Sequence, residues 1–141
     1  MPIRQANAEW NGDLKQGKGT MSLGSGAYTG PYSFGSRFEE GEGTNPEELI
    51  GAAHAGCFSM ALSNILAEAG HKPESVKTDA RVHLTVGDDG ASISEIDLTT
   101  VARVPGLEAN EFQQHVGAAK SGCPVSKLLK GATINVEATL D

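Results

Sequence analysis

The chain has 141 residues and a net charge of −7, from 18 acidic and 11 basic side chains. This length suffices for one domain with its own hydrophobic core. The acidic balance and the scattered basic residues argue against nucleic acid or an anionic membrane as a partner, because phosphate binding needs clustered Lys and Arg. The sequence shows no run of about 18 apolar residues and no signal-peptide core. We therefore expect a single domain over residues 1–141, in the cytoplasm.

The first third of the chain is rich in glycine and predicts short strands. Residues 3–10 and 17–23 read as two strands joined by the turn NGD at 11–13. Residues 24–44 predict a long connection with one further strand near PYSFGSRF. The segment from Gly12 nearly matches a phosphate-binding P-loop, but Gly19 stands where Ser or Thr is required and a strand follows. Nucleotide binding is therefore not expected.

A long helix is the strongest local signal. Asn45 is a favourable N-cap, Pro46 suits the first helical position, and the next two residues, Glu47 and Glu48, favour the positive end of the helix dipole. Gly70 is a natural stop, which gives a helix of about 24 residues. Its apolar residues lie on nearly every face, as in a buried helix. In a small domain such burial needs a wrapping sheet or a second subunit.

The second half predicts a strand hairpin, then helices, then a strand. Its apolar residues alternate with polar ones over two stretches around the turn DDG, then follow a helical period, then alternate again. The expected elements are strands at 76–86 and 93–104, a helix from 108, a helical segment after Cys123 and a strand at 132–140. Strands and helices in this order indicate an α+β fold rather than alternating α/β.

Cys123 is one of only two cysteines, and its position permits two interpretations. In a reducing cytoplasm a structural disulfide is not expected, so each thiol is either an inert core residue or chemically active. Cys123 precedes Pro124 at the start of a helical segment, where free backbone N–H groups and the helix dipole lower a thiol pKa. The alternative is a small residue that fills a tight turn after Gly122.

Cys57, the second cysteine, lies in the middle of the apolar helix. Burial there raises a thiol pKa and leaves the group inert, so a reactive Cys57 needs a cation from elsewhere. Arg37 is the candidate, because it precedes the helix in a glycine-rich segment that is free to fold over it. A buried arginine must be paired, and Glu47 or Glu48 at the helix start could hold it.

A metal site is the alternative use of these thiols. His54 and Cys57 are three residues apart on one helix face, and Cys123 would supply a third ligand. Structural zinc sites usually have four ligands. We therefore expect no metal and no cofactor, with His54 as a partly buried or hydrogen-bonded histidine.

Two segments resemble a known family. GTNPEELIGAAHAGCFSMALS at 43–63 and GCPVSKLL at 122–129 are similar to the OsmC/Ohr family, and more closely to its OsmC (osmotically inducible protein C) branch. The resemblance extends over essentially the whole chain. It implies an α+β fold in which antiparallel sheets wrap two long central helices of an intertwined homodimer, with two active sites at the interface.

The resemblance also implies an activity and a role for four residues. It implies a thiol-dependent peroxidase that reduces organic hydroperoxides to alcohols, and hydrogen peroxide less efficiently. Cys57 corresponds to the peroxidatic cysteine, which forms a sulfenic acid, and Cys123 to the resolving cysteine, which closes a disulfide with it. Arg37 corresponds to the active-site arginine and Glu47 to the carboxylate that holds it. The expected reductant is a dithiol, such as a lipoylated protein.

The spacing of Glu47 and Cys57 makes these roles depend on a dimer. They are ten residues apart, or about 15 Å along a straight helix, so one arginine head group cannot reach both. We therefore predict a composite site, in which Arg37 and Glu47 of one subunit serve Cys57 of the other. Small residues would permit the two helices to approach closely: Ala52, Ala53, Ala55 and Gly56.

The apolar residues near Cys57 predict a substrate preference. An apolar site beside Phe58 and Met60 would favour organic hydroperoxides, since burying an alkyl tail is favourable.

One alternative function is that of a redox sensor or binding protein of the same fold, with a disulfide switch but little turnover. Another is a ligand-binding domain with structural thiols.

Overall fold

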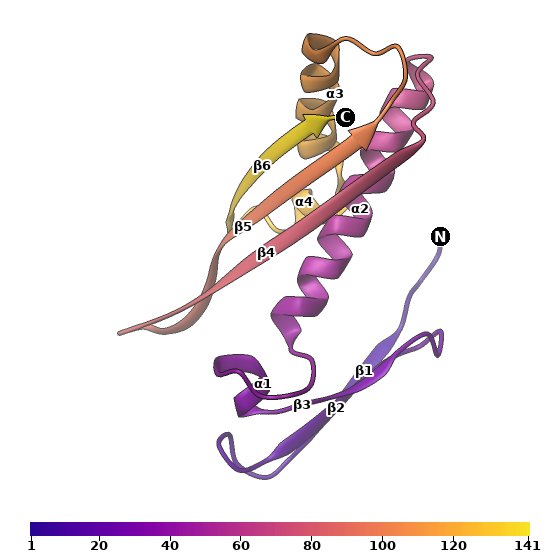
Figure 1. Cartoon of the computed structure of the whole chain (residues 1–141). Coiled ribbons are helices and arrows are strands. Elements are labelled where there is room, and N and C mark those ends of the chain that lie inside the picture. Colours follow the sequence, from indigo (N-terminus) through magenta and orange to yellow (C-terminus); the bar gives the residue numbers. More distant parts are fainter. The chain divides into compact units, whose positions relative to one another are not determined.

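The computed structural model describes residues 1–141, and their contacts divide the chain into two units, Met1–Leu49 and Ile50–Asp141. The first unit contains an antiparallel sheet in the order β1-β2-β3 (Figure 1). Its strands are β1 (Ala6–Asn11), β2 (Lys18–Leu23) and β3 (Thr29–Tyr32). The two strands expected at the start of the chain are confirmed, although β1 begins three residues later than the expected start at residue 3.

Aromatic packing across this sheet depends on one glycine. The rings of Trp10 and Tyr32 lie 5.2 Å apart, on β1 and β3. Gly19 lies between them on β2, and a Cβ atom at this position would collide with both rings. The glycine that breaks the P-loop pattern therefore allows the two aromatic side chains to meet.

A short helix replaces part of a predicted strand. The prediction of a strand near residues 31–38 is wrong beyond Tyr32, because α1 spans Phe34–Phe38. A capping box starts this helix: Ser36 N donates to Ser33 Oγ at 3.1 Å, and Ser33 N donates to Ser36 Oγ at 2.9 Å. These bonds satisfy free backbone N–H groups and outweigh the strand preference of the aromatic residues nearby.

The long helix α2 spans Pro46–Glu68 without a break, as predicted. Asn45 Oδ1 accepts a hydrogen bond from Glu48 N at 2.7 Å, which caps the helix start. At the other end Gly70 has φ of +91°, and His71 N donates to Leu66 O at 2.9 Å. This Schellman motif ends the helix. By length and composition α2 could also cross a membrane, a test that core helices of soluble proteins pass as well.

The faces of α2 differ in burial within the single chain. Phe58, Leu62 and Leu66 are fully buried. Ala52, Ala53, Gly56 and Met60 are exposed, Met60 by 76%. Within the second unit, one face of the apolar helix is therefore left uncovered.

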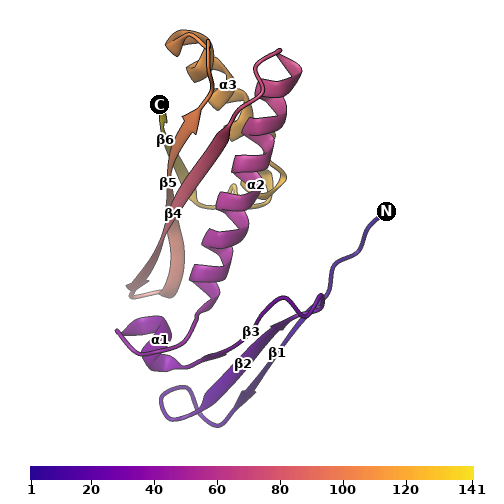
Figure 2. The same cartoon turned by 45° about the vertical axis from the view of Figure 1, so that its right-hand side comes forward.

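The second unit contains a mixed sheet in the order β4-β5-β6 (Figure 2). Strands β4 (Ser75–Gly87) and β5 (Gly90–Arg103) form the expected antiparallel hairpin. Strand β6 (Thr133–Leu140) pairs with β5 in parallel, so this sheet is not purely antiparallel as expected. A parallel neighbour needs a crossover connection, which α3 (Ala109–Gly122) and α4 (Pro124–Leu128) supply.

The core of this unit lies between the sheet and its helices, which cover one face (Figures 1 and 2). Alternate residues of β5 point inward, as the predicted alternation requires. The buried apolar side chains come from α2, β5 and α3, and they include Leu62, Leu66, Ile96, Leu98, Phe112 and Val116. This packing fixes α2 against the sheet and thereby positions the residues of its middle turns.

Candidate active site

The two cysteines lie side by side within the second unit. Their Sγ atoms are 2.9 Å apart, and both are free thiols. Cys57 comes from the middle of α2 and is partly exposed, whereas Cys123 is fully buried. Cys123 is the N-cap residue of α4, as its position before Pro124 predicted, and its sulfur accepts a hydrogen bond from Ser126 N at 3.5 Å. Two thiols at this separation can form a disulfide after a small movement.

The surroundings of the two sulfurs shift their pKa values in opposite directions. Burial raises the pKa of Cys57, and the neighbouring Cys123 raises it further, whereas a backbone hydrogen bond from Val125 lowers it. Burial alone would also raise the pKa of Cys123, but hydrogen bonds from Cys57, Ser126 and Val125 outweigh it and lower the value. None of these groups is a cation. The second unit therefore does not by itself supply the positive charge that a reactive Cys57 thiolate needs.

A buried histidine and serine adjoin the cysteine pair. His54 Nε2 lies 2.7 Å from Ser126 Oγ, so this contact joins a side chain of α2 to one of α4. His54 is fully buried, which lowers its pKa and keeps the ring neutral. The expectation of a hydrogen-bonded histidine is confirmed. Sequence reasoning missed Ser126 as its partner, because 72 residues separate the two and no spacing rule connects them.

Arg37 and Glu47 form an ion pair within the first unit. Arg37 Nε donates to Glu47 Oε1 at 2.8 Å and to Oε2 at 3.2 Å. The Glu47 side chain is 8% exposed and that of Arg37 is 35% exposed, so a nearly buried carboxylate holds a guanidinium that solvent still reaches. Of the two candidate carboxylates at the helix start, Glu47 is therefore the one that pairs with Arg37. Charge-assisted bonds of this kind fix the orientation of the guanidinium plane.

Aromatic side chains surround Arg37 on α1. A pocket of about 240 Å³ is lined by Arg37 and mostly apolar neighbours. Those neighbours are Trp10, Leu14, Tyr32, Ser33, Phe34 and Phe38. The Arg37 guanidinium also lies 5.4 Å from the centre of the Phe38 ring, a cation–π distance. The first unit thus places one cation beside an apolar pocket.

The apolar site expected beside Phe58 and Met60 stays a prediction, since the single chain buries one of these side chains and exposes the other. Phe58 is fully buried in the core of the second unit, and Met60 is exposed on the uncovered face of α2. Sequence reasoning missed the pocket beside Arg37 because its aromatic residues come from separate strands and from the unpredicted helix α1.

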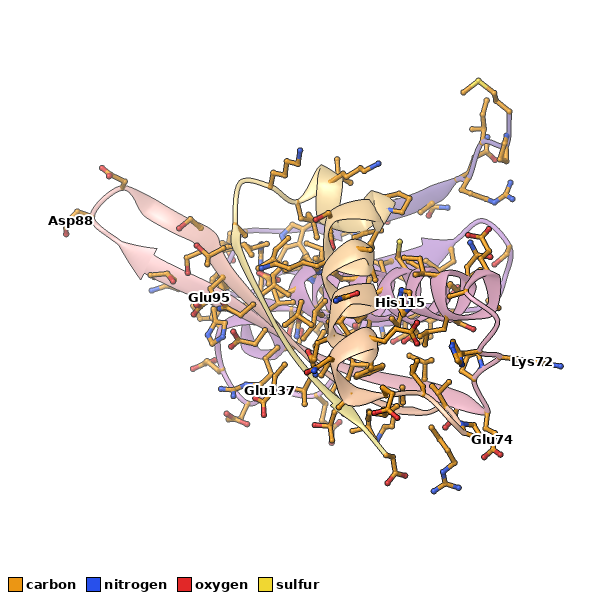
Figure 3. The ribbon with its side chains drawn as sticks, turned by 90° about the horizontal axis from the view of Figure 1, so that it is seen from above. Lys72, Glu74, Asp88, Glu95, His115 and Glu137 are labelled. Carbon is orange, nitrogen blue, oxygen red and sulfur yellow. The ribbon has the colours of Figure 1, made fainter.

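One cluster could hold a metal ion, and it lies away from the cysteines. The ligand atoms of His83, Glu95 and Asp97 are within 4.8 Å of one another on the outer sheet face, and Glu95 points away from α3 (Figure 3). Asn135 Nδ2 donates to Asp97 at 2.9 Å, and His83 Nε2 lies 2.7 Å from the same carboxylate. These bonds, that from Asn135 first, lower the pKa of Asp97. These polar groups therefore satisfy one another's hydrogen bonds across three strands.

Most of this chain matches one known protein family. The family model described as "OsmC-like protein" matches residues 39–138. The chain belongs to the OsmC family. It is 51% identical over 139 residues to "Peroxiredoxin OsmC" of Escherichia coli (strain K12), which covers 98% of this chain and 94% of the relative. It is also 32% identical over 107 residues to "Organic hydroperoxide resistance protein OhrB" of Bacillus subtilis (strain 168), covering 73% of each.

Solved structures show the same OsmC fold. An OsmC-like protein from Vibrio cholerae has a TM-score of 0.77 at 16% identity, over 98% of this chain and 99% of that one. An organic hydroperoxide resistance protein OsmC from Legionella pneumophila has a TM-score of 0.72 at 23% identity, over 100% and 99%. The α+β fold expected from the OsmC/Ohr resemblance is therefore confirmed.

The four residues expected from the OsmC resemblance fall into two pairs. Cys57 and Cys123 meet in the second unit, and Arg37 and Glu47 meet in the first. Each pair brings together the groups that the resemblance associates directly: two thiols, and an arginine with its carboxylate.

Proposed function

We propose that this protein is a thiol-dependent peroxidase that reduces organic hydroperoxides to alcohols. The observation that carries the proposal is the 2.9 Å separation of two free thiols, Cys57 and Cys123, in a chain of the OsmC family. The names of its relatives, a peroxiredoxin and organic hydroperoxide resistance proteins, support it. The first test is turnover of cumene hydroperoxide with dihydrolipoamide as reductant. Absence of turnover in the wild type, or full turnover by Cys57→Ser, contradicts the proposal.

The reaction has three steps on these two sulfurs. The Cys57 thiolate attacks one oxygen of the hydroperoxide, so that an S–O bond forms, the O–O bond breaks and the departing alkoxide takes a proton to become the alcohol. Cys123 then attacks the Cys57 sulfenic acid, which forms the Cys57–Cys123 disulfide and releases water. A dithiol finally reduces the disulfide and becomes a disulfide itself. Hydrogen peroxide would follow the same steps less efficiently.

Arg37, held by Glu47, supplies the positive charge that Cys57 lacks. A guanidinium stabilises the thiolate and donates hydrogen bonds to the peroxide oxygens. The pocket beside Arg37 supports a preference for organic hydroperoxides, since its aromatic walls would bury an organic tail. In this arrangement the tail lies among the aromatic rings and the O–O group faces the guanidinium.

The active site is composite and needs a homodimer. Helix α2 is unbroken from Pro46 to Glu68, and Glu47 and Cys57 are ten residues apart within it. Arg37 and Glu47 of one subunit therefore serve Cys57 and Cys123 of the other, in an intertwined dimer of single-domain chains (residues 1–141). The exposed small residues Ala52, Ala53 and Gly56 on α2 support a close approach of two such helices.

Mixing two impaired variants tests the composite site. Glu47→Gln keeps both cysteines, and Cys57→Ser keeps the arginine and its carboxylate. If the site is composite, a mixed dimer regains one intact site, so an unfolded and refolded equal mixture recovers about a quarter of wild-type activity. If each subunit uses its own arginine, every site stays defective and the mixture shows only the residual activity of the two variants. Each variant refolded alone is the control.

The reductant is a dithiol, and a lipoylated protein is the proposed donor. A second pocket, of about 330 Å³, adjoins Ser126 on the α4 side of the second unit. Three of its lining side chains are Lys120, Lys127 and Lys130, on a chain whose net charge is −7. This local positive charge supports docking of an acidic partner. We place the reaction in the cytoplasm, where such donors are kept reduced.

A redox sensor or binding protein is the second candidate, and it would use the same two thiols. It is favoured if one equivalent of hydroperoxide closes the Cys57–Cys123 disulfide but no dithiol supports further turnover. Steady-state rates with dihydrolipoamide, dithiothreitol and reduced thioredoxin separate the two functions. Sustained turnover with any of them supports the enzyme.

A further inference from the structure

Helices α2 and α4 meet through two side-chain contacts that share one spacing. On α2, His54 and Cys57 are three residues apart, and at the start of α4 the same spacing separates Cys123 from Ser126. His54 Nε2 lies 2.7 Å from Ser126 Oγ, and the two cysteine Sγ atoms are 2.9 Å apart. Residues three apart lie on one face of a helix. The face of α2 that carries Cys57 therefore also contacts α4 through His54.

The Cys123 sulfur is tied to Ser126 by the geometry of the helix start. Cys123 is the N-cap residue of α4, and Ser126 N donates to Cys123 Sγ at 3.5 Å. Lys127 N also donates to Cys123 O at 3.0 Å. Such bonds belong to the first turn of a helix. The position of the Cys123 sulfur therefore follows the position of Ser126.

Helix α4 depends on contacts outside itself for its position. A helix of five residues is not stable alone. Its side chain Val125 and the following Leu129 are partly buried against the core, whereas Leu128 is exposed. The contact between His54 and Ser126 is buried at both ends. Because a hydrogen bond is directional, this contact fixes where the first turn of α4 meets α2 more closely than apolar packing does.

The surroundings of His54 make it the donor in this contact. Its other ring nitrogen, Nδ1, is buried and has no partner. An N–H group at Nδ1 would be an unsatisfied donor, which folded proteins rarely tolerate. Burial also lowers the pKa of His54, so the ring is neutral and carries its one proton on Nε2. His54 Nε2–H therefore donates to Ser126 Oγ.

We propose that the hydrogen bond from His54 to Ser126 holds Cys123 beside Cys57, so that the disulfide closes before a second hydroperoxide oxidises Cys57 further. The proposal rests on the proposed peroxidase function, in which Cys123 is the resolving cysteine. His54 and Ser126 are positioning residues, because both act through the place of the Cys123 sulfur. From this place the sulfurs need to approach by only about 1 Å to form the disulfide bond.

Two reactions compete for the Cys57 sulfenic acid. In closure, the Cys123 sulfur forms the S–S bond as the S–O bond breaks, and the leaving hydroxide takes the Cys123 thiol proton to become water. In over-oxidation, the sulfenic sulfur attacks a second hydroperoxide. A second S–O bond forms, the O–O bond breaks, and the departing alkoxide takes up a proton, which leaves a sulfinic acid and an alcohol. Only closure depends on where Cys123 lies.

The competition between these reactions provides the first measurement. Reduced protein receives excess cumene hydroperoxide without a dithiol, and mass spectrometry gives the fractions of disulfide and of Cys57 sulfinic acid. Ser126→Ala and His54→Leu should each slow closure about tenfold or more, since displacement of a reacting atom by about 1 Å can slow a step a hundredfold. Their sulfinic fraction should rise with hydroperoxide concentration. His54→Gln should restore most of the closure, because its amide N–H can reach the position of Nε2.

Ser59→Ala is the matched control for a general loosening of α2. It removes another hydrogen bond of this helix, from Ser59 Oγ to Thr78 Oγ1 at 2.8 Å, which joins α2 to β4 and not to α4. Its sulfinic fraction should stay at the wild-type level. An equal rise in Ser59→Ala and Ser126→Ala would overturn the positioning role, because the loss would then not depend on the contact with α4.

A thiol–disulfide equilibrium tests the positioning without any peroxide. In a glutathione redox buffer, the fraction of Cys57–Cys123 disulfide reports the effective concentration of one thiol at the other. Ser126→Ala and His54→Leu should each lower the equilibrium constant for disulfide formation about tenfold. The double variant should lower it no further, because both substitutions remove the same hydrogen bond.

Each outcome bears on the positioning role. Unchanged closure or an unchanged glutathione equilibrium in Ser126→Ala overturns it, and so does a His54→Gln variant that behaves like His54→Leu. If His54→Leu fails to fold, Ser126→Ala and His54→Gln still decide. If the wild type consumes no hydroperoxide, the proposed function fails, whereas the glutathione equilibrium still supports or overturns the positioning role.

Discussion

At the scale of single residues, the ion pair with Arg37 distinguishes Glu47 from its neighbour Glu48. Glu47 is nearly buried and accepts both hydrogen bonds from Arg37 Nε, whereas Glu48 is exposed at the next position of α2. Both carboxylates favour the start of the helix, because they face the positive end of its dipole. Only one of them, however, orients the guanidinium. The two positions therefore differ in function although they are alike in charge and in element.

Glu47→Gln should lower kcat/KM for cumene hydroperoxide by about tenfold or more, because the charged hydrogen bonds to Arg37 are lost. Glu48→Gln is the matched control and should stay within about twofold, as expected for an exposed carboxylate. Steady-state kinetics of both variants with the same dithiol provide the measurement. Equal losses at the two positions would contradict the assignment of Glu47.

Arg37 should also determine how the first reaction step depends on pH. Burial raises the pKa of Cys57, and a raised pKa means that the thiol keeps its proton to higher pH. Without the arginine, the rate of hydroperoxide consumption should climb about tenfold per pH unit until that raised pKa is passed. We expect Arg37→Met to be still rising at alkaline pH where the wild type has levelled off. Stopped-flow consumption rates across the pH range test this, and superimposable profiles would contradict it.

At the scale of elements, Asn45 joins the short helix α1 to the start of α2. Its Oδ1 accepts the bond from Glu48 N that caps α2, and its Nδ2 donates to Ser36 O at 2.9 Å. Ser36 in turn donates from Oγ to Thr44 O at 2.7 Å. These bonds hold the turn that carries Arg37 against the turn that carries Glu47. The cap therefore contributes both to stability and to the geometry of the ion pair.

Two substitutions at Asn45 separate these contributions. Asn45→Ala loses the cap and the bond to Ser36, and should destabilise the fold by about 1 kcal/mol or more. Asn45→Asp keeps a capping oxygen but cannot donate to Ser36, so it should retain most of the stability and still lose activity. Urea unfolding at one fixed protein concentration, together with kcat/KM, measures both effects. If Asn45→Asp keeps full activity, the link to Ser36 does not position Arg37.

At the scale of the whole molecule, elements with local signals could be predicted from the sequence. Helix α2 has a cap at Asn45 and a stop at Gly70, and strands β4 and β5 alternate over many residues around a tight turn. Such signals involve neighbours in the chain and do not depend on the rest of the fold. Helix α1 is only five residues long, so its two-serine capping box is a weak sequence signal beside the strand preference of the aromatic residues around it.

Features that depend on distant parts of the chain could not be predicted in this way. The parallel pairing of β6 with β5 follows from the crossover through α3 and α4. The His54–Ser126 pair joins residues 72 positions apart, and the pocket beside Arg37 combines two strands with α1. Local patterns carry no information on these contacts. The resemblance to a family predicted that Cys123 adjoins Cys57, because it reflects a complete folded site.

The uncovered face of α2 is the surface on which the proposed dimer can be tested. Gly56 is exposed there, and a Cβ atom added to it meets nothing within 4 Å in the single chain. A leucine at this position therefore fits the protomer, and it also favours the helix over glycine. Between two closely packed helices the same side chain would force them apart. Gly56→Leu should yield a folded chain with a weakened dimer and little peroxidase activity.

Gly117→Leu is the matched control, because Gly117 is also an exposed helical glycine with nothing within 4 Å of an added Cβ. It lies on α3, so it should leave the dimer and the activity unchanged. Sedimentation velocity and circular dichroism of both variants separate assembly from folding. A composite site ties activity to assembly, so loss of the dimer must abolish turnover even though Cys57 and Cys123 remain adjacent in each chain. A monomeric Gly56→Leu variant with full activity would refute the composite site, and an unchanged dimer would place the interface elsewhere.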